Sequence, residues 1–256
     1  MKRVNRFLTS IFATIFFQTF FEKLHYISLK GMNYGSANSP LYSGELSVLK
    51  ILQKDLPNNA VIFDVGANYG QYLNLLIKYL KDKNITIHCF EPDEYAFKKL
   101  NEKFGRLDYV VLNKFALGSE NNNATLYGKK KGGVDSSLIN TDKDNLEQFS
   151  IEVKTLDSYC LDNNISTIHF LKIDTEGFEL NVLKGAENAF ASNKIKRIQL
   201  EHGSIHSIIA RSSIYEYKKI LKNFTIYHIK QNGIRKLNYK PINEIYYNSN
   251  YYFEKD

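Results

Sequence analysis

One stretch decides the fold: residues 60–70 read AVIFDVGANYG. Residues 60–65 are a short apolar run rich in branched and aromatic side chains, which is typical of a strand buried on both faces. A glycine loop follows directly, and residues 71–81 continue with apolar side chains at helical spacing. We therefore predict a strand, a tight loop and a helix. At the helix start we expect unpaired backbone N–H groups, and Asn68 tolerates a left-handed conformation there.

The next predicted strand, residues 85–90, ends in the carboxylate of Glu91, which suits a ribose diol at the edge of a parallel sheet. The loop lacks the G-x-G-x-x-G spelling of dinucleotide folds. It begins instead with Asp64, which would repel a pyrophosphate but suits a ligand that carries an amino group. This favours S-adenosylmethionine over NAD. The predicted cofactor residues are Asp64, Gly66, Asn68, Gly70 and Glu91.

Here the chain resembles the class I methyltransferases, and within them the FkbM family, whose glycine loop commonly reads D-V-G-A-N-x-G, as residues 64–70 do. Residues 172–186, KIDTEGFELNVLKGA, are similar to the family's K-I-D-x-E-G-x-E-L-x-V-L-K-G-A signature. Residues 136–138 (SSL) and 153–157 (VKTLD) resemble two shorter family segments. The resemblance covers about residues 60–200. It implies a three-layer α/β sandwich with a mostly parallel, Rossmann-like sheet.

The periodicity of the chain predicts the remaining elements of this sandwich. Helices are expected at residues 45–56, 93–104, 178–190 and 212–223, and further strands at residues 109–112, 168–173 and 195–200. Residues 116–118, 124–127 and 151–153 look like short strands without helices between them, which indicates an insertion. Residues 224–229 and 234–239, joined by a turn, are predicted to be an antiparallel hairpin that closes the sheet.

Acidic side chains and a histidine follow two of the predicted strands. Asp174 and Glu176 come after one strand, and Glu201 and His202 end the next. Methyl transfer to a hydroxyl needs a base, and a histidine with an ordinary pKa near 6.5 suits that role, although a histidine at a strand end is more often structural. Asp174, Glu201 and His202 could alternatively hold a divalent metal, but no close ligand spacing supports one. The predicted catalytic residues are Asp174, Glu201 and His202.

Composition limits the partners and the compartment. The 256 residues, 43% of them hydrophobic, suffice for one sizeable core, and the net charge is a modest +7. Basic residues are scattered apart from two short clusters, Lys2-Arg3-Arg6 and residues 129–131, so we expect no nucleic-acid partner. The two cysteines form neither a disulfide framework nor a metal spacing, which fits a reducing cytoplasm.

The N-terminal residues stand apart from this pattern. Residues 7–21 contain no charged side chain and follow Lys2, Arg3 and Arg6. The run is shorter than the ~20 residues of a spanning helix, and no small-residue cleavage site follows it. It is predicted to be a helix that either packs on the domain or, through residues 2–21, rests on the inner face of the cytoplasmic membrane. We expect residues 1–44 to form an N-terminal helix and loop, and residues 45–256 to form the methyltransferase domain.

The resemblance implies S-adenosylmethionine-dependent methyl transfer. We expect O-methylation of a sugar or another hydroxyl, in surface-glycan or secondary-metabolite biosynthesis. One alternative is an NAD-dependent sugar dehydrogenase or epimerase, which would need the missing glycine motif; its Tyr-x-x-x-Lys spacing occurs only at Tyr215 and Lys219, on a late helix. A second alternative is a membrane-associated scaffold that has lost activity.

Overall fold

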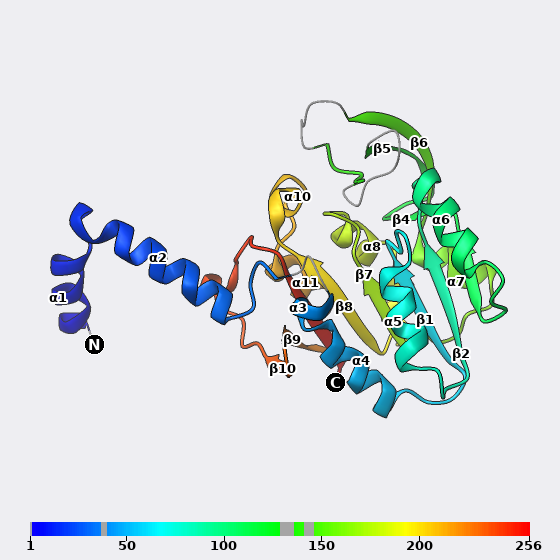
Figure 1. The fold of residues 1–256 in the computed structure, drawn as a ribbon, viewed down its shortest axis with the longest axis horizontal. Helices are drawn as coiled ribbons and strands as arrows, with labels where there is room; N and C mark the ends of the chain where they lie inside the picture. The colour runs from blue at the N-terminus through cyan, green and yellow to red at the C-terminus, as the bar shows by residue number, and fades with distance from the viewer. Residues whose placement is uncertain (1, 37–39, 129–135, 141–145) are drawn as a thin grey trace.

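The computed structural model describes residues 2–36, 40–128, 136–140 and 146–256. Within them, eight strands form one sheet in the order β10-β9-β11-β8-β7-β1-β2-β3 (Figure 1). Their bounds are β1 (Ala60–Val65), β2 (Ile85–Phe90), β3 (Val110–Asn113), β7 (Phe170–Ile173), β8 (Arg197–His202), β9 (Phe224–Lys230), β10 (Gly233–Lys236) and β11 (Ser249–Lys255).

β1 lies at the centre and decides where a ligand can bind. It pairs in parallel with β2 on one side and with β7 on the other. β2 continues to β3 and β7 continues to β8, both again in parallel, so the strand order reverses at β1 and β7. Ligands of open α/β sheets bind outside the carboxyl ends of the strands at such a reversal. The predicted mostly parallel sheet is confirmed.

The far end of the sheet is antiparallel, as predicted, but it contains one strand more than the hairpin. β9 and β10 pair as expected. Between β9 and β8 lies β11, antiparallel to both, and its residues Tyr251, Tyr252 and Phe253 are buried. The prediction stopped at residue 239 and therefore missed this strand.

Helices cover both faces of the sheet, which confirms the three-layer sandwich. One core cluster joins the sheet to α4 (Glu45–Asp55), α5 (Gln71–Tyr79) and α6 (Glu94–Phe104). The other joins it to α7 (Leu156–Asp162), α8 (Glu179–Lys184), α9 (Glu187–Ala191) and α11 (Ile214–Ile220). The expected insertion is a small sheet of β4 (Ala116–Leu117), β5 (Asn122–Gly128) and β6 (Glu147–Lys154).

The helix predicted over residues 178–190 is two helices, α8 and α9. At the break, a Cβ on Gly185 would lie 1.9 Å from the carbonyl oxygen of Gly118, so the backbones are in direct contact there. The carboxylate of Asp157 then accepts hydrogen bonds from the N–H groups of Asn188 and Ala189, at 2.7 and 2.8 Å, and starts the second helix. Both causes are tertiary contacts, which helical periodicity does not reveal.

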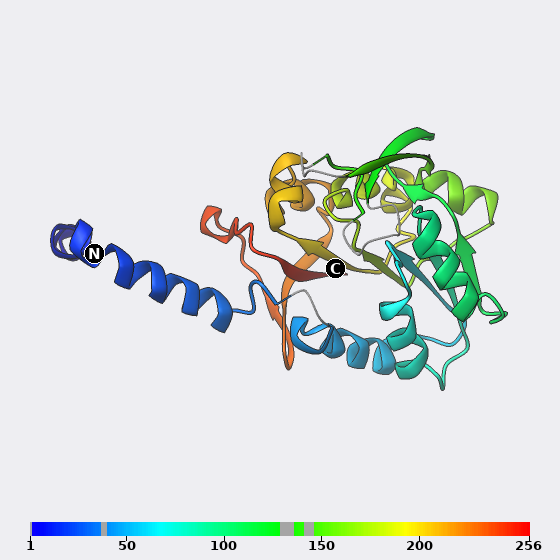
Figure 2. The ribbon, with the colours of Figure 1, turned by 45° about the horizontal axis from the view of Figure 1, so that its top comes forward.

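The N-terminal segment consists of two helices, α1 (Lys2–Phe12) and α2 (Ile15–Gly31), which project from the domain (Figures 1 and 2). Leu29 is the one described side chain of α2 that is buried. Residues 33–35 then fasten the segment: Gly35 N–H donates to the Asn248 carbonyl at 2.7 Å, and Asn33 Nδ2 donates to the Ser43 carbonyl at 2.8 Å. Packing of residues 7–21 on the domain is not observed. No described helix combines the length and apolarity needed to cross a bilayer.

Three further short helices belong to the described part of the chain. α3 (Pro40–Ser43) lies in the segment expected to be a loop, directly before α4, and the 3₁₀ helix η1 (Pro241–Asn243) precedes β11. α10 (Ser204–Ile209) follows the carboxyl end of β8.

Candidate active site

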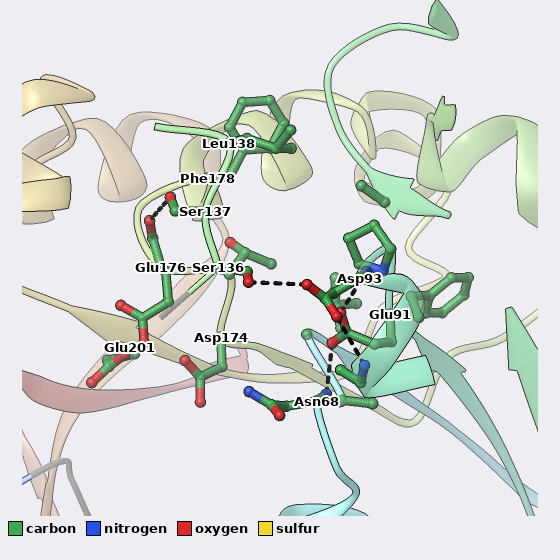
Figure 3. A pocket seen from close by; sticks show the side chains of 18 of the residues that line it. Asn68, Glu91, Asp93, Ser136, Ser137, Leu138, Asp174, Glu176, Phe178 and Glu201 are labelled. Carbon is green, nitrogen blue, oxygen red and sulfur yellow. Dashed lines mark hydrogen bonds between the residues drawn. The ribbon is translucent and has the colours of Figure 1, made fainter. Parts of the chain in front are cut away.

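A pocket of about 650 Å³ lies at the carboxyl ends of β1, β2, β7 and β8, where the strand order reverses (Figure 3). The loop after β1 and Glu91 line one half of it. Asp174, Glu176 and Glu201 line the other half. This volume lies within the range of small-molecule sites.

The glycine loop is shaped by two close approaches. Gly66 has φ +81°, and a Cβ on it would lie 1.8 Å from the carbonyl oxygen of Asp174, so only glycine fits beside the loop after β7. Gly70 has φ +79°, and its Cβ would meet the ring of Phe104 on α6 at 2.4 Å. Asn68, with φ +47°, adopts the left-handed conformation that was predicted.

Backbone N–H groups of the loop before α5 have partners within the described chain, whereas the prediction of unpaired groups concerned the first turn of α5 itself and stays a prediction. Asn68 N–H donates to Glu91 Oε2 at 2.7 Å, and Tyr69 N–H donates to Asn68 Oδ1 at 2.8 Å. Gly70 N–H donates to the Ala67 carbonyl at 2.8 Å. Glu91 therefore braces the loop that borders the pocket.

Glu91 is buried and holds two backbone groups. Besides Asn68 N–H, it accepts a hydrogen bond from Asp93 N–H to Oε1 at 2.9 Å. Burial raises its pKa to about 7, although these two hydrogen bonds oppose the shift. Each carboxylate oxygen keeps a second lone pair, and the residue lines the pocket. Glu91 is therefore able to accept hydrogen bonds from a bound diol.

Asp64 and Gly70 do not line the pocket, although both were predicted to bind the cofactor. Asp64 is fully buried, and Lys172 Nζ lies 3.9 Å from its Oδ1. Burial raises its pKa to about 6, and neither carboxylate oxygen has a hydrogen-bond partner in the described part of the chain. The two residues are register partners on β1 and β7, which places this pair within the sheet. The carboxyl group of Asp64 therefore lies beside Lys172 within the sheet, next to the pocket but outside its lining.

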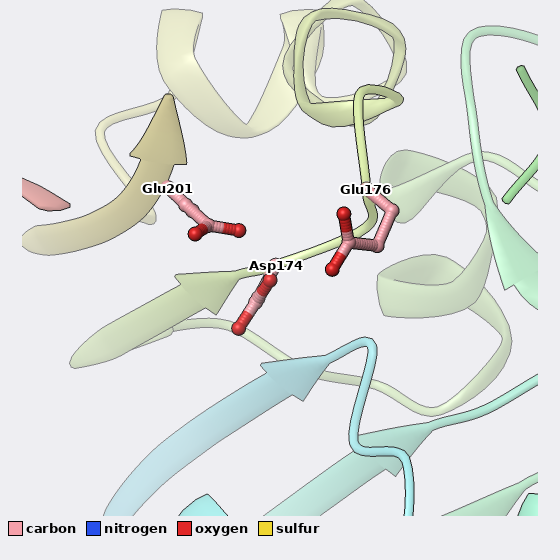
Figure 4. A group of neighbouring side chains, drawn as sticks. All are labelled: Asp174, Glu176 and Glu201. Atoms are coloured by element: carbon pink, nitrogen blue, oxygen red, sulfur yellow. The ribbon is translucent and has the colours of Figure 1, made fainter. Parts of the chain in front are cut away.

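Three carboxylates meet in the other half of the pocket (Figure 4). Asp174, Glu176 and Glu201 each place one oxygen within 4.8 Å of the others. Lys172 Nζ lies 2.9 Å from Asp174 Oδ2, and Asp174 and Glu201 share a hydrogen bond. Burial raises the pKa of Asp174, but Lys172 and the hydrogen bond outweigh it and leave this pKa below its usual range.

Within the pair of Asp174 and Glu201, the surroundings favour the neutral form of Glu201. Burial, together with the charges of Asp174 and Glu176, raises the pKa of Glu201 well above its ordinary value. Lys172 lies beside Asp174 and compensates part of the negative charge of the cluster. The metal set predicted with His202 is not assembled, because that ring does not line the pocket.

Known proteins identify this arrangement. A model of the methyltransferase FkbM domain matches residues 64–240, more than half of the chain, and the match includes the glycine loop and all three acids. The chain belongs to the FkbM methyltransferase family. The resemblance seen in the two sequence signatures is thereby confirmed.

Relatives within and around this family differ in their acceptors. The chain is 26% identical over 161 residues to the 2-O-methyltransferase NoeI of Sinorhizobium fredii, covering 57% of this chain and 64% of that protein. It is 24% identical over 163 residues to the hexuronic acid methyltransferase AglP of Haloferax volcanii, covering 62% of this chain and 64% of that protein. These matches span less than two thirds of each relative's length.

A solved structure confirms the fold. The methyltransferase FkbM from Methylobacillus flagellatus KT superposes with a TM-score of 0.51 at 20% sequence identity, over 84% of this chain and 50% of that one. The Rossmann-like arrangement of the sheet is therefore shared with a member of the FkbM family.

His202, predicted to be the base of this FkbM-family protein, lies outside the pocket lining. Its ring is buried among Tyr217, Tyr246 and Tyr251, at centroid distances of 5.4, 5.3 and 6.2 Å. Burial lowers its pKa to about 4, so the imidazole is neutral at physiological pH. Successive residues of a strand point to opposite faces, and here Glu201 faces the pocket while His202 faces the core. The assignment of His202 as the base is corrected accordingly.

His206, four residues further on, does line the pocket. It lies on α10, and its Nδ1 is 3.5 Å from Glu176 Oε2. A Cβ on Gly177 would lie 2.6 Å from the Cβ of His206, so this glycine lets α10 approach the loop after β7. The sequence analysis did not consider His206, because it stopped at the end of the strand that carries His202. The available signal was Gly177, in the E-G pair of the family signature, since a glycine there allows another element to pack closely.

Residues 136–138, which we call the strap, connect the two halves of the site. Ser136 Oγ donates to Asp93 Oδ2 at 3.1 Å, on the side of β2. Ser137 Oγ donates to the Glu176 carbonyl at 2.6 Å, on the side of β7 (Figure 3). Leu138 adds an apolar side chain to the lining. Residues 129–135, which precede the strap and include one of the two basic clusters, lie outside the described residues.

Proposed function

We propose that this FkbM-family protein transfers a methyl group from S-adenosylmethionine to a hydroxyl oxygen of a sugar. The observation that carries the proposal is the division of one pocket into two halves. A braced glycine loop with Glu91 forms the first half, and a carboxylate cluster with a histidine forms the second. An NAD-dependent dehydrogenase is set aside, because the family match and the loop spelling both oppose it.

The first half suits the methyl donor. The carboxylate of Glu91 would accept hydrogen bonds from the ribose hydroxyls, while Gly66 and Asn68 would border the amino-acid part. S-adenosylmethionine, when bound, supplies an electrophilic methyl group on its sulfonium. Little chemical assistance is needed for this displacement apart from alignment and removal of the hydroxyl proton.

The second half suits the acceptor. The ionised Asp174 would accept a hydrogen bond from a sugar hydroxyl and orient it, and Glu201 would hold Asp174 through their shared proton. We assign the base role to His206, with the carboxylate of Glu176 orienting its ring from 3.5 Å. His206 would accept the proton that the acceptor hydroxyl loses when its oxygen receives the methyl group, and S-adenosylhomocysteine would be the leaving product.

A sugar acceptor is supported by two similar proteins, one a 2-O-methyltransferase and the other a hexuronic acid methyltransferase. Carboxylate, hydroxyl and amide side chains line the pocket and suit a substrate that is rich in hydroxyl groups. We place the reaction in the cytoplasm, where S-adenosylmethionine is made. An inactive scaffold is disfavoured by the preserved pair of Asp174 and Lys172.

The test is transfer of an isotope-labelled methyl group from S-adenosylmethionine to a panel of glycan acceptors that includes uronic acids. The expected product carries the label on an ether oxygen. His206→Asn should lower kcat by roughly 10²–10⁴-fold, the usual contribution of a general base, without weakening S-adenosylhomocysteine binding.

The matched control is His202→Gln, which changes a histidine outside the pocket and should keep most of the turnover. If His206→Asn retains wild-type kcat, the base assignment is wrong. If labelled product fails to form with every acceptor although the donor binds, the inactive scaffold becomes the better description.

A further inference from the structure

The two N-terminal helices expose an unusual amount of apolar surface. Residues 7, 8, 11 and 12 of α1 follow helical spacing, and Phe7 is 64% exposed. On α2, Ile15 is 93% exposed and Phe16 is 86% exposed. The break at residues 13–14 separates α1 from α2, so α1 presents an apolar stripe of its own. We call residues 2–35 the arm, with residues 33–35 as its base.

The charge of the arm has one sign over most of its length. Residues 1–21 contain Lys2, Arg3 and Arg6 and no acidic residue; the first acid is Glu22. Apolar side chains beside basic ones are typical of a segment that lies in a membrane interface. Two arms of two copies would bring like charges together, so charge complementarity favours an anionic partner over a second copy of this chain.

A second apolar patch lies beside the pocket. Ile208 and Ile209 of α10 are exposed, and α10 also carries the pocket residue His206. The base of the arm reaches the same region: Gly35 N–H donates to the carbonyl of Asn248, and Asn248 lines the pocket. Both views show the arm leaving the domain on the side that carries α10 (Figures 1 and 2).

We propose that the arm and the exposed isoleucines of α10 bind the surface of an anionic lipid bilayer, with the pocket opening beside the lipid. The aromatic and aliphatic side chains would enter the headgroup boundary, and the basic residues would contact lipid phosphates. Resting on the proposed sugar methylation, this surface makes a lipid-linked or membrane-assembled glycan the acceptor class.

The experiment is flotation of the full-length protein with phosphatidylcholine vesicles, with and without phosphatidylglycerol, at low ionic strength. Wild type should float with the anionic vesicles only. Ile15→Ser/Phe16→Ser should weaken binding by at least roughly tenfold because it removes two apolar side chains from the interface. Lys2→Gln, Arg3→Gln and Arg6→Gln should each weaken binding by about fivefold, because each removes one positive charge.

The matched control is Leu161→Ser, which removes a side chain that is 77% exposed on α7, away from the arm. It should float like wild type, whereas Ile208→Ser/Ile209→Ser should float less. Each variant should keep the thermal transition and the S-adenosylhomocysteine affinity of wild type, so lipid binding is measured independently of the methylation proposal.

Three outcomes would overturn the proposal. Wild type could stay unbound, or it could float equally well with neutral vesicles. Alternatively, light scattering could show a dimer that Ile15→Ser/Phe16→Ser converts to a monomer in the absence of lipid binding, which would assign the arm to a second copy of the chain.

Discussion

Glu91 illustrates how one side chain can set both the shape and the pH response of the site. Its two oxygens fix the N–H groups of Asn68 and Asp93, and its burial raises its pKa to about 7. The identity of the acid was readable from the sequence, since it directly follows β2. Its bond to the loop was not, because nothing local indicates which N–H group it reaches.

Cofactor affinity should therefore depend on pH. Because the pKa of Glu91 is raised, its ionised fraction grows as pH rises through 7, and only the carboxylate accepts from both ribose hydroxyls. Affinity for S-adenosylhomocysteine should fall by roughly tenfold from about pH 8 to about pH 6. Calorimetry across this range measures it. Glu91→Gln should bind more weakly at high pH and show a flat profile; a variant that keeps the wild-type slope would assign the titration to another group.

Gly66 makes a prediction about stability. An alanine there would take a left-handed φ and place its Cβ 1.8 Å from the Asp174 carbonyl oxygen, so Gly66→Ala should lower the free energy of unfolding by about 2–5 kcal/mol. Gly31→Ala is the control, since its Cβ meets nothing within 4 Å, and it should change stability by less than about 1 kcal/mol. Urea unfolding compares the two, and equal values would show that the approach is not tight.

Elements were predictable from sequence where local pattern dominates. The strand, loop and helix of residues 60–79 and the strand that leads to Asp174 carry their own periodicity and turn residues. The division between α8 and α9 depends on Asp157 and on the contact of Gly185 with Gly118, which are distant in sequence. That His206 lines the pocket and His202 does not has the same origin, because packing between elements decides which side chains point into the pocket.

The strap should act separately on the two halves of the site. Ser136→Ala removes its bond to Asp93 and should raise the KM for S-adenosylmethionine, while Ser137→Ala removes its bond to Glu176 and should raise the KM for the acceptor. One hydrogen bond of about 1 kcal/mol corresponds to roughly fivefold in each case. Steady-state kinetics with each substrate varied separates them. Ser192→Ala, an exposed serine, is the control; identical effects of both strap variants would remove the distinction.

At the scale of the whole molecule, the order of strands in the sheet explains where the pocket lies and where the arm is attached. The reversal between β1 and β7 puts the donor half and the acceptor half side by side, and it follows from the parallel pairing expected of the family. β11 could not be foreseen from the hairpin signal, yet the segment that leads into it supplies Asn248, to which the base of the arm is fastened. The boundary between residues 44 and 45 stays a prediction, and Leu29 and Tyr34 already belong to the core.

Isothermal titration with S-adenosylmethionine, S-adenosylhomocysteine and NAD, side by side on the full-length protein, tests the central claim most directly. Both sulfur ligands should bind one site, NAD should give no binding heat, and Glu91→Ala should weaken both by roughly ten- to hundredfold, as expected for a charged hydrogen bond. Binding of NAD without the sulfur ligands, or unchanged affinity in a folded Glu91→Ala protein, would contradict the assignment of this pocket.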